Sequence, residues 1–142
     1  MPRLLPALVR WLPALMVMSL IFLSSSISAP ELPNLGPLDL VFKKGGHVVA
    51  YCVLAIACWC GLRWRLDFRR LAWVLAVLYA TTDEVHQWFT LGRHAWWLDV
   101  VLFDALGAML GLWLAGKILL WVSYSNSRSS SSSSPQSSRR SM

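Results

Sequence analysis

The chain has 142 residues, of which 56% are hydrophobic and only 14% are charged, and its formal net charge is +6. Soluble globular domains carry roughly 25% charged residues, so this composition argues against an ordinary soluble protein and favours an integral membrane protein. A membrane-spanning helix needs about 20 mainly apolar residues to cross the hydrocarbon layer.

Four segments of the chain meet this requirement. They cover residues 11–30, 45–62, 71–91 and 98–121. The sequence therefore predicts an all-α integral membrane protein that folds as a four-helix transmembrane bundle, with residues 11–121 as the membrane domain. Residues 1–10 are expected to form a cytoplasmic N-terminus, and the Ser- and Arg-rich composition of residues 122–142 predicts a disordered cytoplasmic tail.

The first segment has a second interpretation. Arg3 and Arg10, the apolar run of residues 11–23 and the small residues SSSISA are also typical of a secretory signal peptide. We favour a retained helix, because Pro30 and the absence of a later soluble domain argue against a leader. Cleavage would leave three spans and would not move the remaining sites across the membrane.

The second segment begins with polar residues and holds three cysteines. Lys44, His47 and Tyr51 are three and four residues apart, which places them on one helix face. The cysteine spacing matches neither a CxxC redox pair nor a zinc knuckle, so we expect packing roles for these small, readily buried side chains. The cysteines are Cys52, Cys58 and Cys60.

The third segment ends in TTDEVHQWF, where ionisable side chains interrupt an apolar helix at considerable energetic cost. Asp83, His86 and Gln87 share one helix face because they are three and four residues apart, whereas Glu84 points about 100° away from Asp83.

The fourth segment begins with two acidic residues, Asp99 and Asp104. Asp104 precedes a stripe of small residues with a GxxxG pattern at Gly107 and Gly111, which permits close helix approach. We therefore expect Asp104 to face the bundle and Asp99 to lie at its rim. The Gly107 and Gly111 face permits a homo-oligomer but would equally serve packing within one chain.

The Lys and Arg residues predict the orientation, because short loops that carry positive charge stay cytoplasmic. With both termini inside, ten of the thirteen Lys and Arg residues lie on the cytoplasmic side. There they face anionic lipid headgroups. The basic pI therefore indicates membrane lipids as partners, and no motif for nucleic acid is present.

Alternating topology brings the polar ends of the last three segments into one layer at the outer third of the membrane. The candidate ligand-binding residues of this layer are Lys44, His47, Tyr51, Asp83, Glu84, His86, Gln87, Arg93, Asp99 and Asp104. One interpretation is a structural polar network that fixes helix register. The number of groups favours a ligand or catalytic site instead, because apolar packing stabilises a bundle at lower cost.

The chemistry of this layer stays open at the level of sequence. Histidines and carboxylates suit a metal, but no HExxH or comparable pattern is present, so metal and cofactor are both undetermined. Lys44 and Arg93 suit an anionic headgroup such as phosphate. Asp83, Glu84 and His86 are the candidates for acid/base catalysis. Nucleophiles are candidates only by position, and they are Ser24, Ser25, Ser26, Thr81 and Thr82.

Several motifs occur together in a specific order. They are IFLSSS (21–26), KGGHVVAY (44–51), DEVHQWF (83–89), GR (92–93) and DVVLFDALGAMLG (99–111). In this combination the chain resembles the VanZ-like family of small bacterial membrane proteins over residues 11–121. One departure is Lys43, which stands where the family often has an Asp before the Lys of KxxH.

The resemblance implies a multi-pass protein of the bacterial cytoplasmic membrane. It also implies a link to resistance against the glycopeptide teicoplanin, whose target is a lipid-linked cell-wall precursor on the outer membrane face. We therefore expect a protein that binds or shields a lipid-linked or cell-envelope headgroup. The alternative is a membrane hydrolase or transferase with Asp83 or Glu84 and His86 as its acid/base pair.

Overall fold

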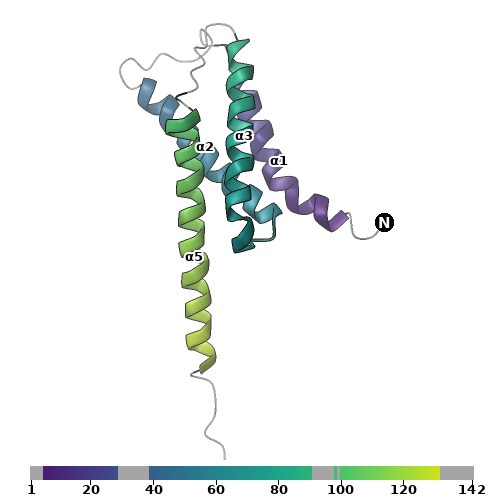
Figure 1. Ribbon diagram of the computed structural model, residues 1–142, viewed down its shortest axis with the longest axis vertical. Coiled ribbons are helices and arrows are strands. Elements are labelled where there is room, and N and C mark those ends of the chain that lie inside the picture. The colour runs from purple at the N-terminus through teal and green to yellow at the C-terminus, as the bar shows by residue number, and fades with distance from the viewer. Residues whose placement is uncertain (1–4, 29–38, 91–97, 99, 132–142) are drawn as a thin grey trace, which may run out of the picture.

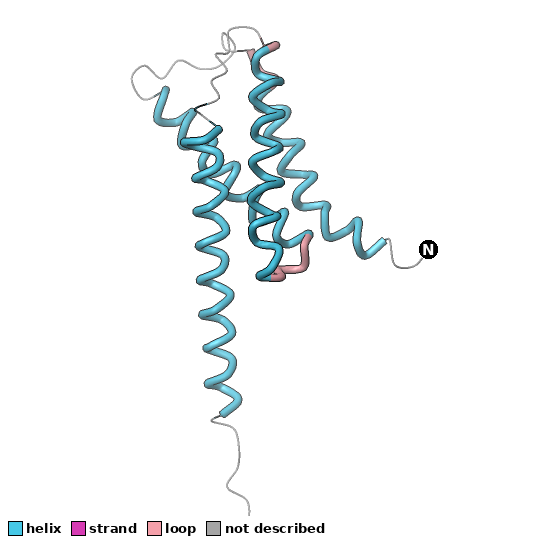
Figure 2. Tube along the Cα trace, in the orientation of Figure 1, coloured by secondary structure: helices cyan, strands magenta, loops and turns pink. Residues whose placement is uncertain are grey.

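The computed structural model describes residues 5–28, 39–90, 98 and 100–131. Its four long elements are α1 (Leu5–Ser25), α2 (Asp39–Gly61), α3 (Arg69–Trp88) and α5 (Ala105–Ser131). Two short elements precede the last two helices, the 3-10 turn η3 (Leu66–Phe68) and the π-helical segment η4 (Val100–Asp104). The described part of the chain contains no strand, which confirms the all-α prediction (Figure 2).

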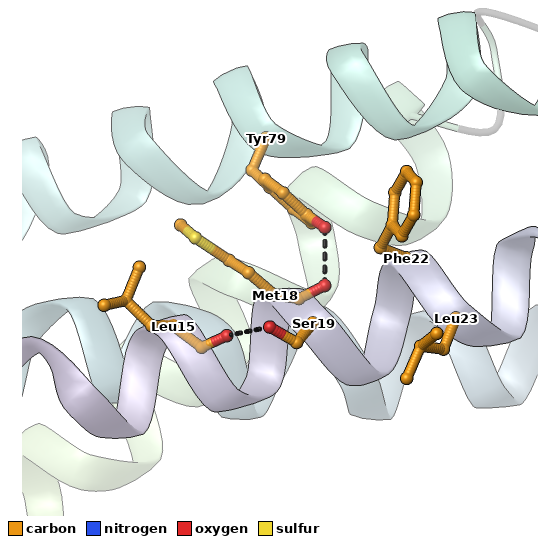
Figure 3. Close-up of a pocket in the computed structure, with 6 residues that line it drawn as sticks. All are labelled: Leu15, Met18, Ser19, Phe22, Leu23 and Tyr79. Carbon is orange, nitrogen blue, oxygen red and sulfur yellow. Dashed lines mark hydrogen bonds between the residues drawn. The ribbon is translucent and has the colours of Figure 1, made fainter.

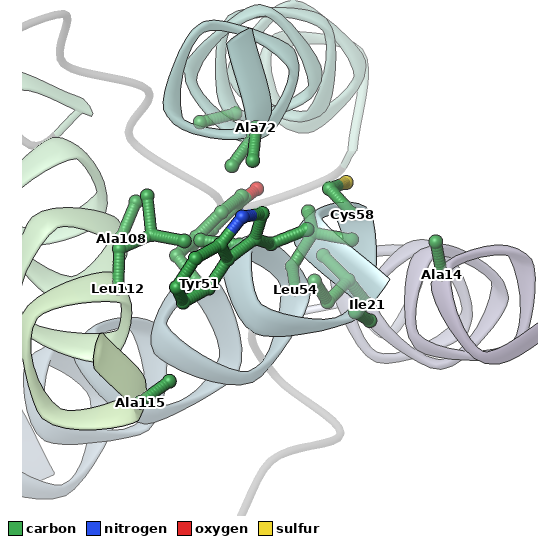
Figure 4. Close-up of a cluster of buried hydrophobic side chains, with 14 of the residues drawn as sticks. Ala14, Ile21, Tyr51, Leu54, Cys58, Ala72, Ala108, Leu112 and Ala115 are labelled. Atoms are coloured by element: carbon green, nitrogen blue, oxygen red, sulfur yellow. The ribbon is translucent and has the colours of Figure 1, made fainter. Parts of the chain in front are cut away.

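α2 lies at the centre of the bundle and contacts each of the other three long helices (Figure 1). Its Tyr51 and Leu54 side chains are almost completely buried. Figure 4 shows them among small side chains from the neighbouring helices, with Ala14 on α1, Ala72 on α3 and Ala108 on α5. Large side chains from the central helix thus fill the space that alanines on its neighbours leave.

The GxxxG pattern brings α5 directly against α2. A Cβ atom at Gly107 would lie 2.5 Å from the Val48 carbonyl oxygen, and one at Gly111 would overlap the Cys52 carbonyl oxygen. Only glycine lets the two backbones approach this closely. The face that we expected to serve either an oligomer or packing within the chain is therefore covered by α2 of the same chain.

α3 presents a stripe of small residues to the bundle, and this stripe continues into the polar residues. Ala72, Ala76, Ala80, Asp83 and Gln87 are all buried. Successive spacings of four and three residues keep them on one helix face. Asp83 and Gln87 are therefore buried because they extend the face that the alanines define.

Three of the described helices are long and apolar enough to cross a membrane. Their apolar stretches are Leu8–Ser25, Lys44–Gly61 and Leu102–Arg128. Of the four expected segments, α3 does not meet this measure of length and composition. Its last two turns carry Asp83, Glu84, His86 and Gln87, which lower the mean hydropathy of the helix.

The turn after α2 has an unusual backbone. Arg63 (φ 65°) and Trp64 (φ 55°) adopt the left-handed conformation that side chains normally disfavour. The Trp59 indole donates a hydrogen bond to the Arg65 carbonyl oxygen at 2.9 Å, and the Trp59 and Trp64 rings meet edge to face at 5.2 Å. Tryptophan packing therefore stabilises a turn that would otherwise favour glycine.

α5 projects beyond the other helices (Figure 1). We expected disorder from residue 122, but the helix continues to Ser131, and residues 117–128 are exposed. Extending an existing helix adds one backbone hydrogen bond per residue without a new nucleation step, so it does not require burial. Residues 1–4 and 132–142 lie outside the described residues.

Candidate functional site

The polar cluster is centred on Asp83 of α3. Its Oδ2 accepts hydrogen bonds from the Tyr51 hydroxyl of α2 at 3.2 Å and from the Gln87 amide at 2.9 Å. The same amide nitrogen donates to the Ser25 hydroxyl of α1 at 3.4 Å. All four residues are at least 95% buried. One carboxylate therefore connects three helices in the interior.

A second contact joins α2 to the start of α5. His47 Nδ1 lies 3.1 Å from Oδ1 of Asp104, which is 1% exposed. Asp104 ends the π-helical segment η4, a rare geometry that often occurs at functional sites. The His47 and Tyr51 rings stack with their centroids 6.2 Å apart, so this contact adjoins the Asp83 cluster.

Two further sequence candidates lie close to this pair. Lys44 Nζ is placed 5.0 Å from the centroid of the Phe103 ring, and Lys44 is half-buried. Glu84 is also half-buried, and its carboxylate acts electrostatically on the His47 imidazole together with Asp83 and Asp104. Charges of both signs therefore meet at this end of the bundle.

His86 faces a different neighbour from Asp83 and Gln87, although its spacing predicted a shared face. Its Nε2 lies 3.0 Å from Ser26 Oγ at the end of α1, and its ring contacts Phe22 with the centroids 4.5 Å apart. Asp83 and Gln87 are buried in the bundle, whereas His86 is half-buried at the α1 side. His86 therefore contacts a hydroxyl of α1, and its role in acid/base catalysis stays a prediction.

One carboxylate oxygen in the cluster is unsatisfied. Both donors reach Asp83 Oδ2, whereas Oδ1 is buried without a hydrogen-bond partner among the described residues. Buried polar atoms almost always have hydrogen-bond partners. An exception therefore indicates an acceptor that can bind a ligand, an ion or a water molecule.

The remaining candidates cannot be placed in the same way. Arg93 and Asp99 lie outside the described residues, so their roles stay predictions. In the described ranges, no group of three or more His, Cys, Asp or Glu side chains is arranged to hold a metal ion.

The sequence interpretation missed the contribution of α1. Ser25 and Ser26 were candidates only as nucleophiles by position, yet they contact Gln87 and His86. The sequence did contain an indication of these contacts. The serine run ends the first predicted span, and DEVHQ ends the third predicted span at the same side of the membrane. Helical periodicity does not show which residues from distant segments meet.

The fold and the cluster together define a helical protein with long apolar helices and a buried polar site at one end. Residues 10–123 match the VanZ/LLP1 family model, so the chain belongs to the VanZ/LLP1 family. The expected VanZ-like identity is thereby confirmed. Family membership and the three apolar helices support a membrane protein. No curated protein and no solved structure matches the chain.

Proposed function

We propose that this VanZ-like protein binds or shields a lipid-linked or cell-envelope headgroup at the outer face of the bacterial cytoplasmic membrane. In this arrangement both termini are cytoplasmic, and the polar cluster lies towards the outer surface. Protection of a lipid-linked cell-wall precursor would connect such binding to teicoplanin resistance.

The observation that carries the proposal is Oδ1 of buried Asp83, which has no hydrogen-bond partner among the described residues. Leaving a buried acceptor without a partner costs about 1–3 kcal/mol, so a protein that needed only stability would gain by an apolar residue there. A water molecule that bridges to the headgroup can donate to this buried oxygen. Lys44 and His47, at the same end of α2, suit the phosphate of that headgroup.

Native mass spectrometry of the purified full chain tests the proposal. The protein would be incubated in detergent micelles with a polyprenyl phosphate or with phosphatidylglycerol, and the retained lipid would be weighed. We expect wild type to retain the polyprenyl phosphate and Asp83→Ala to lose it. Asp67→Ala serves as the matched control, because the Asp67 side chain is 79% exposed in the turn before α3.

Folding is checked separately by size-exclusion chromatography, and Asp83→Asn provides a variant of the same shape if Asp83→Ala does not fold. Retention that is equal in wild type and folded Asp83 variants would contradict the proposal. An empty wild type, with polar substitutions that lower only the folded yield, would identify the cluster as a structural network.

A membrane hydrolase or transferase is the second candidate, and the 3.0 Å contact between Ser26 Oγ and His86 Nε2 favours it. A histidine in this position can accept the proton of a serine nucleophile. Here, however, the Ser26 hydroxyl donates to the Phe22 carbonyl oxygen at 2.8 Å, so Nε2–H donates to Ser26. General-base catalysis would require the opposite tautomer, and we therefore place binding first.

The two functions differ in what Ser26→Ala removes. A binding protein would retain the polyprenyl phosphate and release no product from it. An enzyme would convert the lipid in wild type, and Ser26→Ala would abolish the product while leaving retention intact.

A further inference from the structure

An open groove runs along α1 beside α3 (Figure 3). Its volume is about 390 Å³, within the usual range of small-molecule sites. Leu15 and Leu23 are more than half exposed, so the groove opens to the surroundings of the bundle. Its lining residues are Leu15, Met18, Ser19, Phe22, Leu23 and Tyr79.

The hydroxyl donors in this lining are already used within the protein. Ser19 donates to the Leu15 carbonyl oxygen at 2.8 Å, and Tyr79 donates to the Met18 carbonyl oxygen at 2.6 Å, as Figure 3 shows. The groove therefore offers its occupant apolar surface and no uncommitted hydroxyl proton. Such a lining favours a hydrocarbon over a polar ligand.

The groove is nearly as long as the hydrocarbon part of one membrane leaflet. Its α1 residues span positions 15–23, which is about 12 Å along a helix that rises 1.5 Å per residue. Half of the hydrocarbon core measures roughly 15 Å. A single lipid chain that enters from one membrane surface can therefore lie along the groove.

Polar groups stand at one end of this apolar path. Phe22 lines the groove and contacts the His86 ring at 4.5 Å, and Ser26 Oγ lies beyond it, 3.0 Å from His86 Nε2. The order of an apolar groove followed by an imidazole and a hydroxyl matches the order of chain and headgroup in a lipid.

We infer that the groove between α1 and α3 holds one hydrocarbon chain of a lipid whose headgroup lies at the polar end of the groove, where Ser26 and His86 adjoin the Asp83 cluster through Ser25 and Gln87. The inference rests on the proposed function and adds to it the position of the chain. Only 17% of the apolar stretch Leu8–Ser25 is buried within the protein, so the bilayer itself supplies the occupant.

Photo-crosslinking of the full chain in vesicles tests this inference. The vesicles would contain phosphatidylethanolamine, phosphatidylglycerol and a small fraction of phosphatidylglycerol with a diazirine on one acyl chain. Mass spectrometry should locate the crosslinks mainly at the groove residues. Ser19→Trp fills the groove and should lower their yield severalfold. Leu20→Trp is the matched control, because Leu20 lies on α1 outside the lining and is 65% exposed.

Crosslinks that spread evenly over exposed apolar positions, or that persist in folded Ser19→Trp, would overturn the inference. Ser19→Leu provides a smaller filling side chain if the tryptophan variant does not fold. The two proposals fail separately. If the groove residues give no crosslinks but the protein still retains polyprenyl phosphate, only the inference about the groove is contradicted. If the groove residues give crosslinks but the protein does not retain polyprenyl phosphate, only the proposed function is contradicted.

Discussion

Among single residues, Tyr51 holds the polar cluster together most directly. Its hydroxyl donates to Asp83, and its ring stacks against His47. Tyr51 therefore links the hydrogen bonds of Asp83 to the contact between His47 and Asp104. We expect Tyr51→Phe to lower the free energy of unfolding by about 1.5–3 kcal/mol, because it removes a buried hydrogen bond to a carboxylate. Thermal unfolding in detergent would measure the change.

Tyr124→Phe is the control for that experiment, since Tyr124 is 58% exposed on the projecting part of α5. Equal shifts in the two variants would mean that the Tyr51 hydroxyl makes no special contribution to the cluster.

The sequence predicted part of this residue-scale arrangement. Spacing alone indicated that Asp83 and Gln87 share a face and that Asp104 points into the bundle, and their burial agrees. The contact of His86 with Ser26 joins residues 60 positions apart. Local periodicity carries no information about such a pairing, because it depends on how α1 and α3 pack.

For the helices as elements, the contact between α2 and α5 is the most sensitive to substitution. We expect Gly111→Ala to destabilise the fold by about 1–3 kcal/mol, because the added Cβ meets the Cys52 backbone, which cannot turn aside. Gly45→Ala is the matched control within α2, since no described atom lies within 4 Å of a Cβ added there. That change should stabilise the helix by up to about 1 kcal/mol.

Thermal unfolding of the two variants side by side measures the difference. An unchanged midpoint for Gly111→Ala would show that the α2–α5 contact is looser than the structure indicates.

Apolar length and spacing predicted the four long helices, but not every boundary or helix type. The π-helical turn at Val100–Asp104 interrupts a segment whose composition suggests an ordinary helix. Asp104, the last residue of this turn, contacts His47 of α2, and no local sequence pattern encodes that contact. The sequence also did not predict that α5 extends to Ser131. A Ser- and Arg-rich composition indicates that residues are not buried, but it does not show where an existing helix ends.

For the whole molecule, the expected orientation can be measured directly. Ile27→Cys and Asp67→Cys would each be introduced into a chain whose native cysteines are replaced by alanine. A membrane-impermeant maleimide applied to intact cells should label position 27 at the end of α1. It should reach position 67, in the turn between α2 and α3, only after permeabilisation. The reverse pattern would place the polar cluster on the cytoplasmic side.

The close approach at Gly107 and Gly111 also makes the bundle mechanically asymmetric. On the α5 side, α2 is held by backbone pressed against backbone, a contact that tolerates almost no displacement. α1 is joined to α3 through the longer side chains of Tyr79, Gln87 and His86, which can follow small movements without losing their hydrogen bonds. The polar cluster therefore lies between a rigid contact of α2 with α5 and a more adaptable contact of α1 with α3. The groove lies on the adaptable side.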